Sequence, residues 1–137
     1  MHEWALAESI VMAAVEEAQK EKLKKITQVT VYIGELQQIE KEIFLFALGE
    51  LAKLQKLPIT KDAFQLKTEN STLTCKICGE TWTYNDMKKK LKETESESIH
   101  FIPEIVFVHA RCPKCGSPDF EIIKGRGVVL SSIKGVR

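Results

Sequence analysis

The sequence predicts an α+β fold in which two helices pack on one face of a small three-stranded sheet, with a four-cysteine module inserted in the chain. Three observations predict it: two segments with helical apolar spacing, three segments with alternating apolar residues, and two Cys-x-x-Cys-Gly motifs between the second and third strands. At 137 residues, the chain has the size of one domain with a small accessory module. We expect residues 1–70 and 125–137 to form the α+β domain and residues 71–124 the inserted one.

The first helix and the first strand follow each other closely. From Trp4 to Lys20, apolar residues recur at three- and four-residue intervals, which predicts an amphipathic helix. Residues 27–35 then alternate β-branched apolar residues with Thr30 and Tyr32, and Gly34 marks the end of this segment. We therefore expect a half-buried strand there.

The second helix and the remaining strands complete the predicted domain. Helical spacing returns at Ile39 and lasts until Leu57, where Pro58 closes the segment. Residues 64–69 alternate apolar with polar residues, as do residues 127–134 near the C-terminus. These two segments are expected to pair with residues 27–35 in one sheet.

Charge and hydropathy exclude several classes of function. The 20 basic and 19 acidic side chains nearly balance, so the chain lacks the strongly basic character typical of nucleic-acid binding or of attachment to anionic membranes. The early apolar run ends at Glu16, far short of the roughly 20 residues that a membrane span needs. Because the first residues carry no signal-peptide pattern, we expect a cytoplasmic protein without nucleic-acid or membrane partners.

The four cysteines form two copies of one motif. Cys75 and Cys78 precede Gly79, and Cys112 and Cys115 precede Gly116. Each Cys-x-x-Cys pair can direct two thiolates at one ion, and the glycine can adopt the left-handed conformation that turns the chain beneath the metal. The four cysteines are predicted to bind one structural zinc ion, because a closed set of four thiolates leaves no position for water or substrate.

Two other roles for the cysteines are disfavoured. Disulfides are rare in a reducing cytoplasm. Redox-active Cys-x-x-Cys pairs usually begin a helix in a thioredoxin-like unit, whereas we expect these pairs in turns between short strands.

The interval between the two motifs is long and contains two of the three histidines. Residues 85–93 are expected to begin a short helix capped by Asn85 or Asp86, with a lysine-rich face that is simply solvated. His109 follows apolar residues and is predicted to lie in a strand, without a ligand role. His100 is either a packing residue or an added metal ligand, and both interpretations stay open.

The N-terminus can chelate a metal. The Met1 amine, the backbone nitrogen and ring nitrogen of His2, and the amide nitrogen of Glu3 can supply four planar donors, an arrangement that suits Ni(II) or Cu(II). The alternative is a frayed end with an incidental histidine.

Taken together, Met1-His2-Glu3, the helix from Leu6 to Ala18, Ile33-Gly34-Glu35-Leu36 and the paired cysteine motifs closely resemble the HypA family of hydrogenase-maturation nickel metallochaperones. The resemblance implies a nickel site around His2 and a separate zinc site at the four cysteines. It also implies that nickel is delivered, with a nickel-handling GTPase as partner, to the large-subunit precursor of a nickel-iron hydrogenase. The interval between the cysteine motifs looks longer than in many relatives, so contacts of the zinc module are expected to differ.

The leading hypothesis is therefore a nickel metallochaperone that carries Ni(II) as cargo and holds Zn(II) structurally. The alternative is a zinc-ribbon adaptor that binds protein or nucleic acid. An enzyme is not expected, because three scattered histidines and a closed cysteine set offer neither an activated nucleophile nor an open metal position. We assign no role to Glu35, Glu40 and Glu42.

Overall fold

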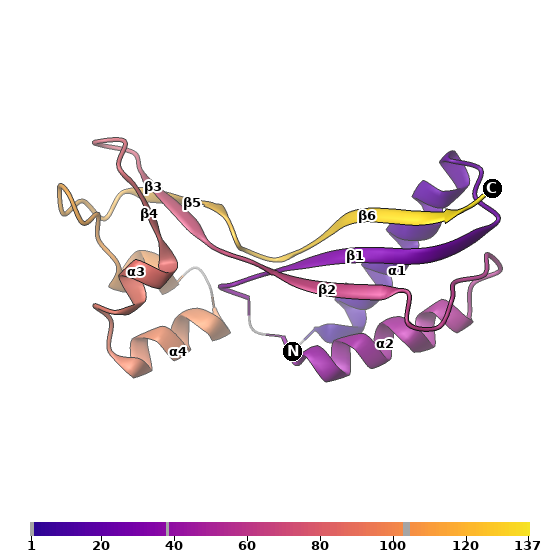
Figure 1. Ribbon diagram of the computed structural model, residues 1–137. Helices are drawn as coiled ribbons and strands as arrows, with labels where there is room; N and C mark the ends of the chain where they lie inside the picture. Colours follow the sequence, from indigo (N-terminus) through magenta and orange to yellow (C-terminus); the bar gives the residue numbers. More distant parts are fainter. Residues whose placement is uncertain (1, 38, 103–104) are drawn as a thin grey trace. The chain divides into compact units, whose positions relative to one another are not determined.

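The computed structural model describes residues 2–37, 39–102 and 105–137, except for the side chains of Ser96, His100 and Phe101. The chain forms two compact units (Figure 1). The helical unit comprises Met1–Tyr32, Ile39–Lys67 and Val128–Arg137, and the cysteine unit comprises Ile33–Gln38 and Thr68–Gly127. The predicted α+β class is confirmed, since each unit combines helices with a small sheet.

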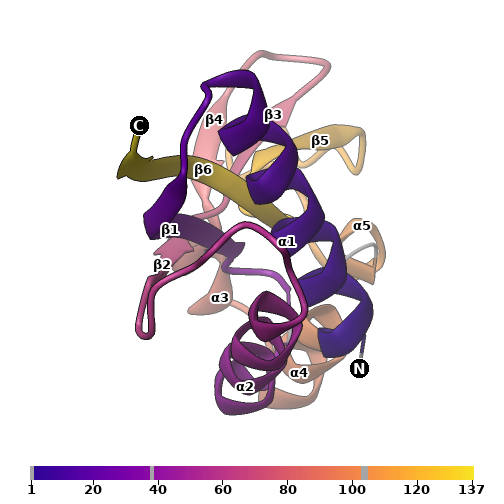
Figure 2. The ribbon, with the colours of Figure 1, turned by 90° about the vertical axis from the view of Figure 1, so that its right-hand side faces the viewer.

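The helical unit contains two long helices and a three-stranded sheet. Its elements are α1 (Glu3–Lys20), β1 (Lys25–Gly34), α2 (Lys41–Lys53), β2 (Phe64–Glu69) and β6 (Val128–Val136), with strand order β2-β1-β6. The helices α1 and α2 lie on the same side of this sheet (Figure 2). The expected arrangement of two helices on three strands is therefore present.

The core of the helical unit arises from the apolar spacing of its elements. Small residues face inward along α1, which allows α2 and the sheet to approach closely. The alternating residues of β1 point into the same core, and Phe44 of α2 is fully buried. The buried side chains are those of Ala7, Ile10, Val11, Ala14, Ala18, Ile26, Val29, Val31, Phe44, Ala47, Leu48 and Ala63.

In its described residues, the cysteine unit has a second sheet and three short helices. The strands β3 (Thr72–Cys75), β4 (Thr81–Thr83) and β5 (Phe120–Lys124) form an antiparallel sheet in the order β4-β3-β5. The helices are α3 (Tyr84–Lys88), α4 (Glu93–Phe101) and α5 (Val106–His109). In the register of this sheet, Leu73 pairs with Trp82 on one side and with Ile122 on the other. Trp82 and Phe120 meet edge to face, with ring centroids 5.4 Å apart.

Two local predictions for this unit are wrong. The first short helix begins after Thr83, whose Oγ1 accepts a hydrogen bond from the Asp86 backbone N–H at 3.2 Å, so neither Asn85 nor Asp86 is the cap. His109 ends a helix and does not lie in a strand, because Val106 turns into the core and its carbonyl accepts from the Ala110 N–H. Four apolar residues are too few to distinguish the two periodicities.

The segment 33–38 belongs to the cysteine unit, whereas the sequence predicts it as part of the first domain. Leu36 is fully buried in the apolar cluster of this unit, and its backbone N–H donates to the Gly125 carbonyl. The backbone segments around Gly34 and Gly125 approach so closely that a Cβ atom on Gly34 would overlap the backbone of Gly125. The Glu35 carboxylate, for which the sequence predicts no role, accepts a hydrogen bond from the Ser71 N–H at 3.0 Å.

No helix in the described ranges combines the length and the apolar character needed to cross a lipid bilayer. This finding agrees with the short apolar runs seen in the sequence.

Candidate metal centre

The first knuckle, residues 75–79, turns tightly at the end of β3. The Cys75 Sγ accepts hydrogen bonds from the backbone N–H groups of Ile77 and Cys78 at 3.4 and 3.5 Å. The Gly79 N–H donates to the Cys75 carbonyl at 3.1 Å, and Gly79 has a φ of 79°. The predicted left-handed glycine is confirmed, and it lets the chain reverse beneath the two sulfur atoms.

The second knuckle, residues 112–116, repeats this geometry almost contact for contact. The Cys112 Sγ accepts from the N–H groups of Lys114 and Cys115 at 3.4 and 3.5 Å, and Gly116 has a φ of 75°. The second knuckle follows α5 and precedes β5, so the expectation of a strand on both sides holds only for the first. The motif thus forms the same turn in two different structural contexts, which shows that its shape is encoded locally.

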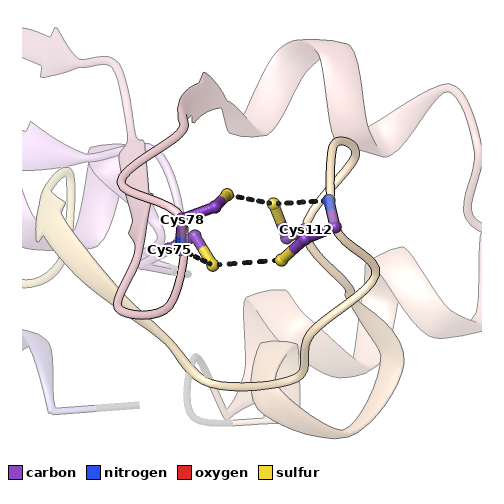
Figure 3. A group of neighbouring side chains, drawn as sticks. Cys75, Cys78 and Cys112 are labelled. Carbon is purple, nitrogen blue, oxygen red and sulfur yellow. Dashed lines mark hydrogen bonds between the residues drawn. The ribbon is translucent and has the colours of Figure 1, made fainter.

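The two knuckles face each other and bring all four sulfur atoms together (Figure 3). The Cys75 and Cys115 sulfurs are 3.6 Å apart, as are those of Cys78 and Cys112, and all four lie within 4.8 Å of one another. A metal with four thiolates at about 2.3 Å places its sulfurs about 3.8 Å apart in a tetrahedron. A disulfide needs a separation of about 2.05 Å, and all four cysteines are free thiols. The donor set therefore fits one tetrahedral metal ion.

Nearby backbone N–H groups favour the thiolate form of two of the four cysteines. The backbone N–H of Cys78, followed by that of Ile77, lowers the pKa of the Cys75 thiol against the opposing effect of burial. Burial alone would raise the pKa of Cys112, but the N–H groups of Cys115 and Lys114 outweigh it and lower this pKa to about 7. In each knuckle, the first cysteine is therefore the more readily ionised when the protein is free of metal.

The second cysteine of each knuckle behaves differently. The Glu80 N–H favours the thiolate of Cys78, yet burial and the neighbouring Cys112 sulfur together raise its pKa. The Ser117 N–H acts likewise on Cys115, while burial and the Cys75 sulfur raise its pKa to about 12. Four thiolates cannot lie this close without a cation, so binding of a metal ion must release protons from this pair.

The N-terminal residues begin α1. His2 is the N-cap residue and is exposed, its carbonyl accepts the Leu6 N–H at 2.9 Å, and its ring makes no capping hydrogen bond. The Glu3 side chain is only 5% exposed, and its carboxylate accepts from the backbone N–H of Glu40 at 3.4 Å. Met1, the remaining predicted nickel ligand, lies outside the described residues.

The two other histidines lie in the cysteine unit. His100 belongs to α4, with its side chain outside the described part of the structure. The His109 Nδ1 lies 2.9 Å from the Glu95 carboxylate, a contact that the sequence does not predict. Glu95 is the third residue of α4, where a carboxylate can reach back to the N-cap backbone, but this position gives no signal for the contact with His109.

Comparison with known proteins supports the metal-binding assignment. A family model described as "Hydrogenase/urease nickel incorporation, metallochaperone, hypA" matches residues 1–135. The hydrogenase maturation factor HypA of Pyrococcus horikoshii is 44% identical over 134 residues, which cover 98% of this chain and 95% of that protein. The corresponding factor of Ignicoccus hospitalis is 32% identical over 136 residues, which cover 98% and 96%.

A solved structure shows the same fold. The solution structure of the Ni metallochaperone HypA from Helicobacter pylori superposes with a TM-score of 0.66 over 99% of this chain and 98% of that chain, at 22% sequence identity.

The fold and the four-thiol site define a two-unit metal-binding protein in which one metal has a structural position. The chain belongs to the HypA family, as the match over residues 1–135 and the 44% identity to curated relatives show. It is therefore a metallochaperone of nickel incorporation that acts in hydrogenase maturation.

Proposed function

We propose that this chain binds Ni(II) at its N-terminus and, with a nickel-handling GTPase, delivers it to the large-subunit precursor of a nickel-iron hydrogenase. Nickel is cargo, and the protein acts as a carrier and not as an enzyme. The observation that carries the proposal is the membership of the HypA family together with an exposed histidine at the second position. The cytoplasm, where apo-precursor and GTPase would be met, is the proposed location.

We propose zinc as the ion of the four-cysteine site. Four thiolates in tetrahedral positions select zinc or an iron–sulfur cluster. One ion centred between sulfurs 3.6 Å apart matches a mononuclear site. Cys75, Cys78, Cys112 and Cys115 would hold it. When bound, zinc supplies folding free energy to the cysteine unit, and the closed set of thiolates keeps substrate away from the metal.

The position of Glu3 at the start of α1 supports a backbone role for this residue in the proposed nickel site. The amide nitrogen of Glu3 lies in the first turn of α1, next to the exposed His2. The Glu3 carboxylate is buried toward Glu40, so we propose that Glu3 contributes its backbone nitrogen, beside the amine of Met1 and two nitrogens of His2.

The pH should govern this site strongly. Nickel must displace protons from an α-amino group, whose ordinary pKa is about 7.7 to 8.0, and from two amides. The affinity should therefore rise steeply with pH across the neutral range, which suits a site that has to release its cargo. Copper should bind at least as tightly by the usual divalent order, so that selectivity would depend on metal availability and on the partner proteins.

The first prediction tests the ligand set by Ni(II) titration of the zinc-loaded protein. His2→Ala and a variant with one glycine added before Met1 should each lose at least about 100-fold in affinity, because both disrupt the fused chelate rings. The visible d–d band of planar nitrogen coordination should be absent in both variants. The control carries the same glycine at the C-terminus and should bind like the native protein.

A normal titration by the N-terminally extended protein would mean that the amine is not a ligand, and the site would have to be redrawn. The same titration of the His100→Ala variant is a separate test, since we propose His100 as an added ligand from α4. An unchanged affinity and spectrum in that variant would remove His100 from the ligand set and leave the N-terminal site intact.

A further inference from the structure

Strand β6 lies at one edge of the sheet in the helical unit (Figure 1). In the described part of the structure β1 is its only strand neighbour, because the order of the sheet is β2-β1-β6. An edge strand presents a row of backbone N–H and C=O groups that no other strand of its sheet pairs. The outer edge of β6 is therefore a template for hydrogen bonds to another extended chain.

The sequence of β6 does little to protect this edge. Edge strands commonly avoid pairing with other chains by being short or by carrying lysine or proline residues. β6 has nine residues without a proline, and Lys134 is its single charged residue. The opposite edge strand, β2, has six residues and includes both Lys67 and Glu69. The edge formed by β6 is thus the longer and less charged of the two.

The strand β6 is held in place from its inner side and from its end. Gly135 approaches β1 so closely that an added Cβ atom would overlap the carbonyl oxygen of Lys25. At the end of the chain, the Nε of Arg137 donates to the backbone carbonyl of Glu21 at 3.0 Å. The Nη2 of Arg137 also lies 3.1 Å from the Glu21 carboxylate. These contacts position the strand without using its outer edge.

A groove of about 630 Å³ lies between α1 and β6, and we call it the α1–β6 groove. Its strand wall includes the four consecutive residues 130–133. Because successive side chains of a strand point to opposite faces, a groove lined by four residues in a row follows the edge of the strand. Its helix wall is one face of α1, formed by Ala13, Glu16, Glu17 and Lys20.

The shape of the α1–β6 groove fits an extended chain. The residues 130–135 of β6 cover about 17 Å at about 3.4 Å per residue, which matches a strand of ordinary length. Along this length the strand wall supplies backbone donors and acceptors, and the helix wall supplies side chains. Domains that add a peptide strand to an exposed sheet edge use the same division: backbone bonds give affinity and side-chain contacts give selectivity.

The charges of the α1–β6 groove favour a basic occupant. Three carboxylates line it, those of Glu16, Glu17 and Glu21, together with the two cations Lys20 and Arg137. Lys20 lies 3.6 Å from Glu16, and Arg137 pairs with the third carboxylate. Neither of these ion pairs includes Glu17, whose side chain is exposed. The groove thus has one carboxylate in excess, which a lysine or arginine of the occupant would complement.

We propose that the α1–β6 groove binds an extended segment of a partner protein, which pairs with β6 as a fourth strand and places a basic side chain near Glu17. Glu17 lies about 21 Å along α1 from Glu3, at about 1.5 Å per residue, so this surface is separate from the proposed nickel ligands. A second copy of this chain is disfavoured as the occupant. Antiparallel pairing of two β6 strands would turn the carboxylate-bearing walls of two α1 helices toward each other, and like charges oppose association.

The probe is the blocked hexapeptide acetyl-Val-Thr-Lys-Thr-Val-Thr-amide, which carries its lysine and both valines on one face of a strand. It is added to ¹⁵N-labelled, zinc-loaded protein of full length. Amide chemical shifts should move at residues 130–135 and in the second half of α1, with saturation below about 5 mM peptide. Cross-strand nuclear Overhauser effects between the backbone protons of the peptide and of β6 should show the β pairing. Residues 65–68 of β2, the other edge, provide the internal control.

A charge reversal tests the contribution of Glu17. Glu17→Lys should weaken binding of the peptide about three- to tenfold, because an attraction at an exposed position is replaced by a repulsion of similar size. The peptide with glutamate in place of lysine should show the opposite preference and bind this variant better than the native protein. Glu8→Lys is the matched control, because Glu8 is exposed on the same helix and does not line the groove. Equal weakening by both variants would contradict a specific role of Glu17.

A bulky side chain in the α1–β6 groove provides a test that does not depend on charge. Ala13→Trp places a large ring on the helix wall and should weaken peptide binding about tenfold or more, because the ring occupies space that the peptide needs. Ala5→Trp is its control, since Ala5 is an exposed alanine of α1 that does not line the groove. The ¹⁵N spectrum and the zinc content of each variant show whether it keeps its fold.

The outcomes separate the possible occupants of the edge. Saturable shifts along β6 that are lost in Ala13→Trp and kept in Ala5→Trp support the proposal. An absence of saturable shifts at residues 130–135, or equal shifts at β2, would overturn it. Sedimentation of the protein without peptide tests the second copy. A dimer whose amides at residues 130–135 are already protected from hydrogen exchange would show that a second chain occupies the edge, which would also overturn the proposal.

Discussion

The helical unit and the cysteine unit differ in what holds their cores together. The helical unit buries a continuous set of apolar side chains from two long helices and a sheet. The cysteine unit has shorter strands, three short helices and a cluster of buried residues that includes Cys75 and Cys112 themselves. The four-thiol site is therefore part of the core of the cysteine unit. The comparison teaches that the two units should respond to different perturbations, and the predictions below test this separation.

The largest effect should come from removing one metal ligand. Cys75→Ser should release the zinc and unfold much of the cysteine unit, because structural zinc supplies about 10 kcal/mol or more of folding free energy. Trp82, which is 7% exposed on the core, should become solvated, while Trp4 in the helical unit should report an intact fold. In a Trp4→Phe background the fluorescence of Trp82 reports on the cysteine unit, and in a Trp82→Phe background the fluorescence of Trp4 reports on the helical unit. Zinc content is measured on the same samples. Retention of one zinc per chain in the presence of a chelator would argue against the four-cysteine site.

A large-to-small substitution in the core of the helical unit should destabilise that unit and leave the cysteine unit intact. Phe44→Ala removes a fully buried ring and should destabilise the helical unit by about 3–5 kcal/mol. The cysteine unit should keep its zinc, because none of its ligands depends on that core. Urea unfolding followed by Trp4 fluorescence measures the loss, and zinc content is determined on the same sample. Simultaneous loss of zinc would show that the units fold as one and not separately.

Two glycines provide the smallest and most local contrast. Gly125 in the cysteine unit has a φ of 88°, and an added Cβ atom would overlap Ser71, so Gly125→Ala should cost about 1–3 kcal/mol. Gly49 in α2 has open space around it, so Gly49→Ala should stabilise the helical unit by about 0.5–1 kcal/mol. The urea midpoint of unfolding of each variant measures its change in stability. A stabilised Gly125→Ala protein would refute the close approach at Ser71.

Much of the fold could be predicted because the signals are local. Helical spacing along α1 and alternation along β1 each repeat over enough residues to identify the element. The two Cys-x-x-Cys-Gly motifs predicted both left-handed glycines and the meeting of four thiols, since each knuckle forms its turn from its own backbone. Short segments were less predictable: the four residues of α5 resemble a strand in composition, and Thr83 competed with two nearby residues that cap helices equally well.

By itself, the sequence determined the α+β class, the positions of the long elements, the clustering of the four cysteines and the presence of a histidine in second place. The tertiary structure alone decided that Leu36 belongs to the cysteine unit, that Glu35 binds the Ser71 backbone, and that Glu95 meets His109. The reason is physical. Periodicity and turn motifs arise from interactions within a few residues, whereas these contacts join segments that are brought together only when an apolar core forms. Single polar residues carry no periodic signal for such partners, and their roles become visible only in the folded chain.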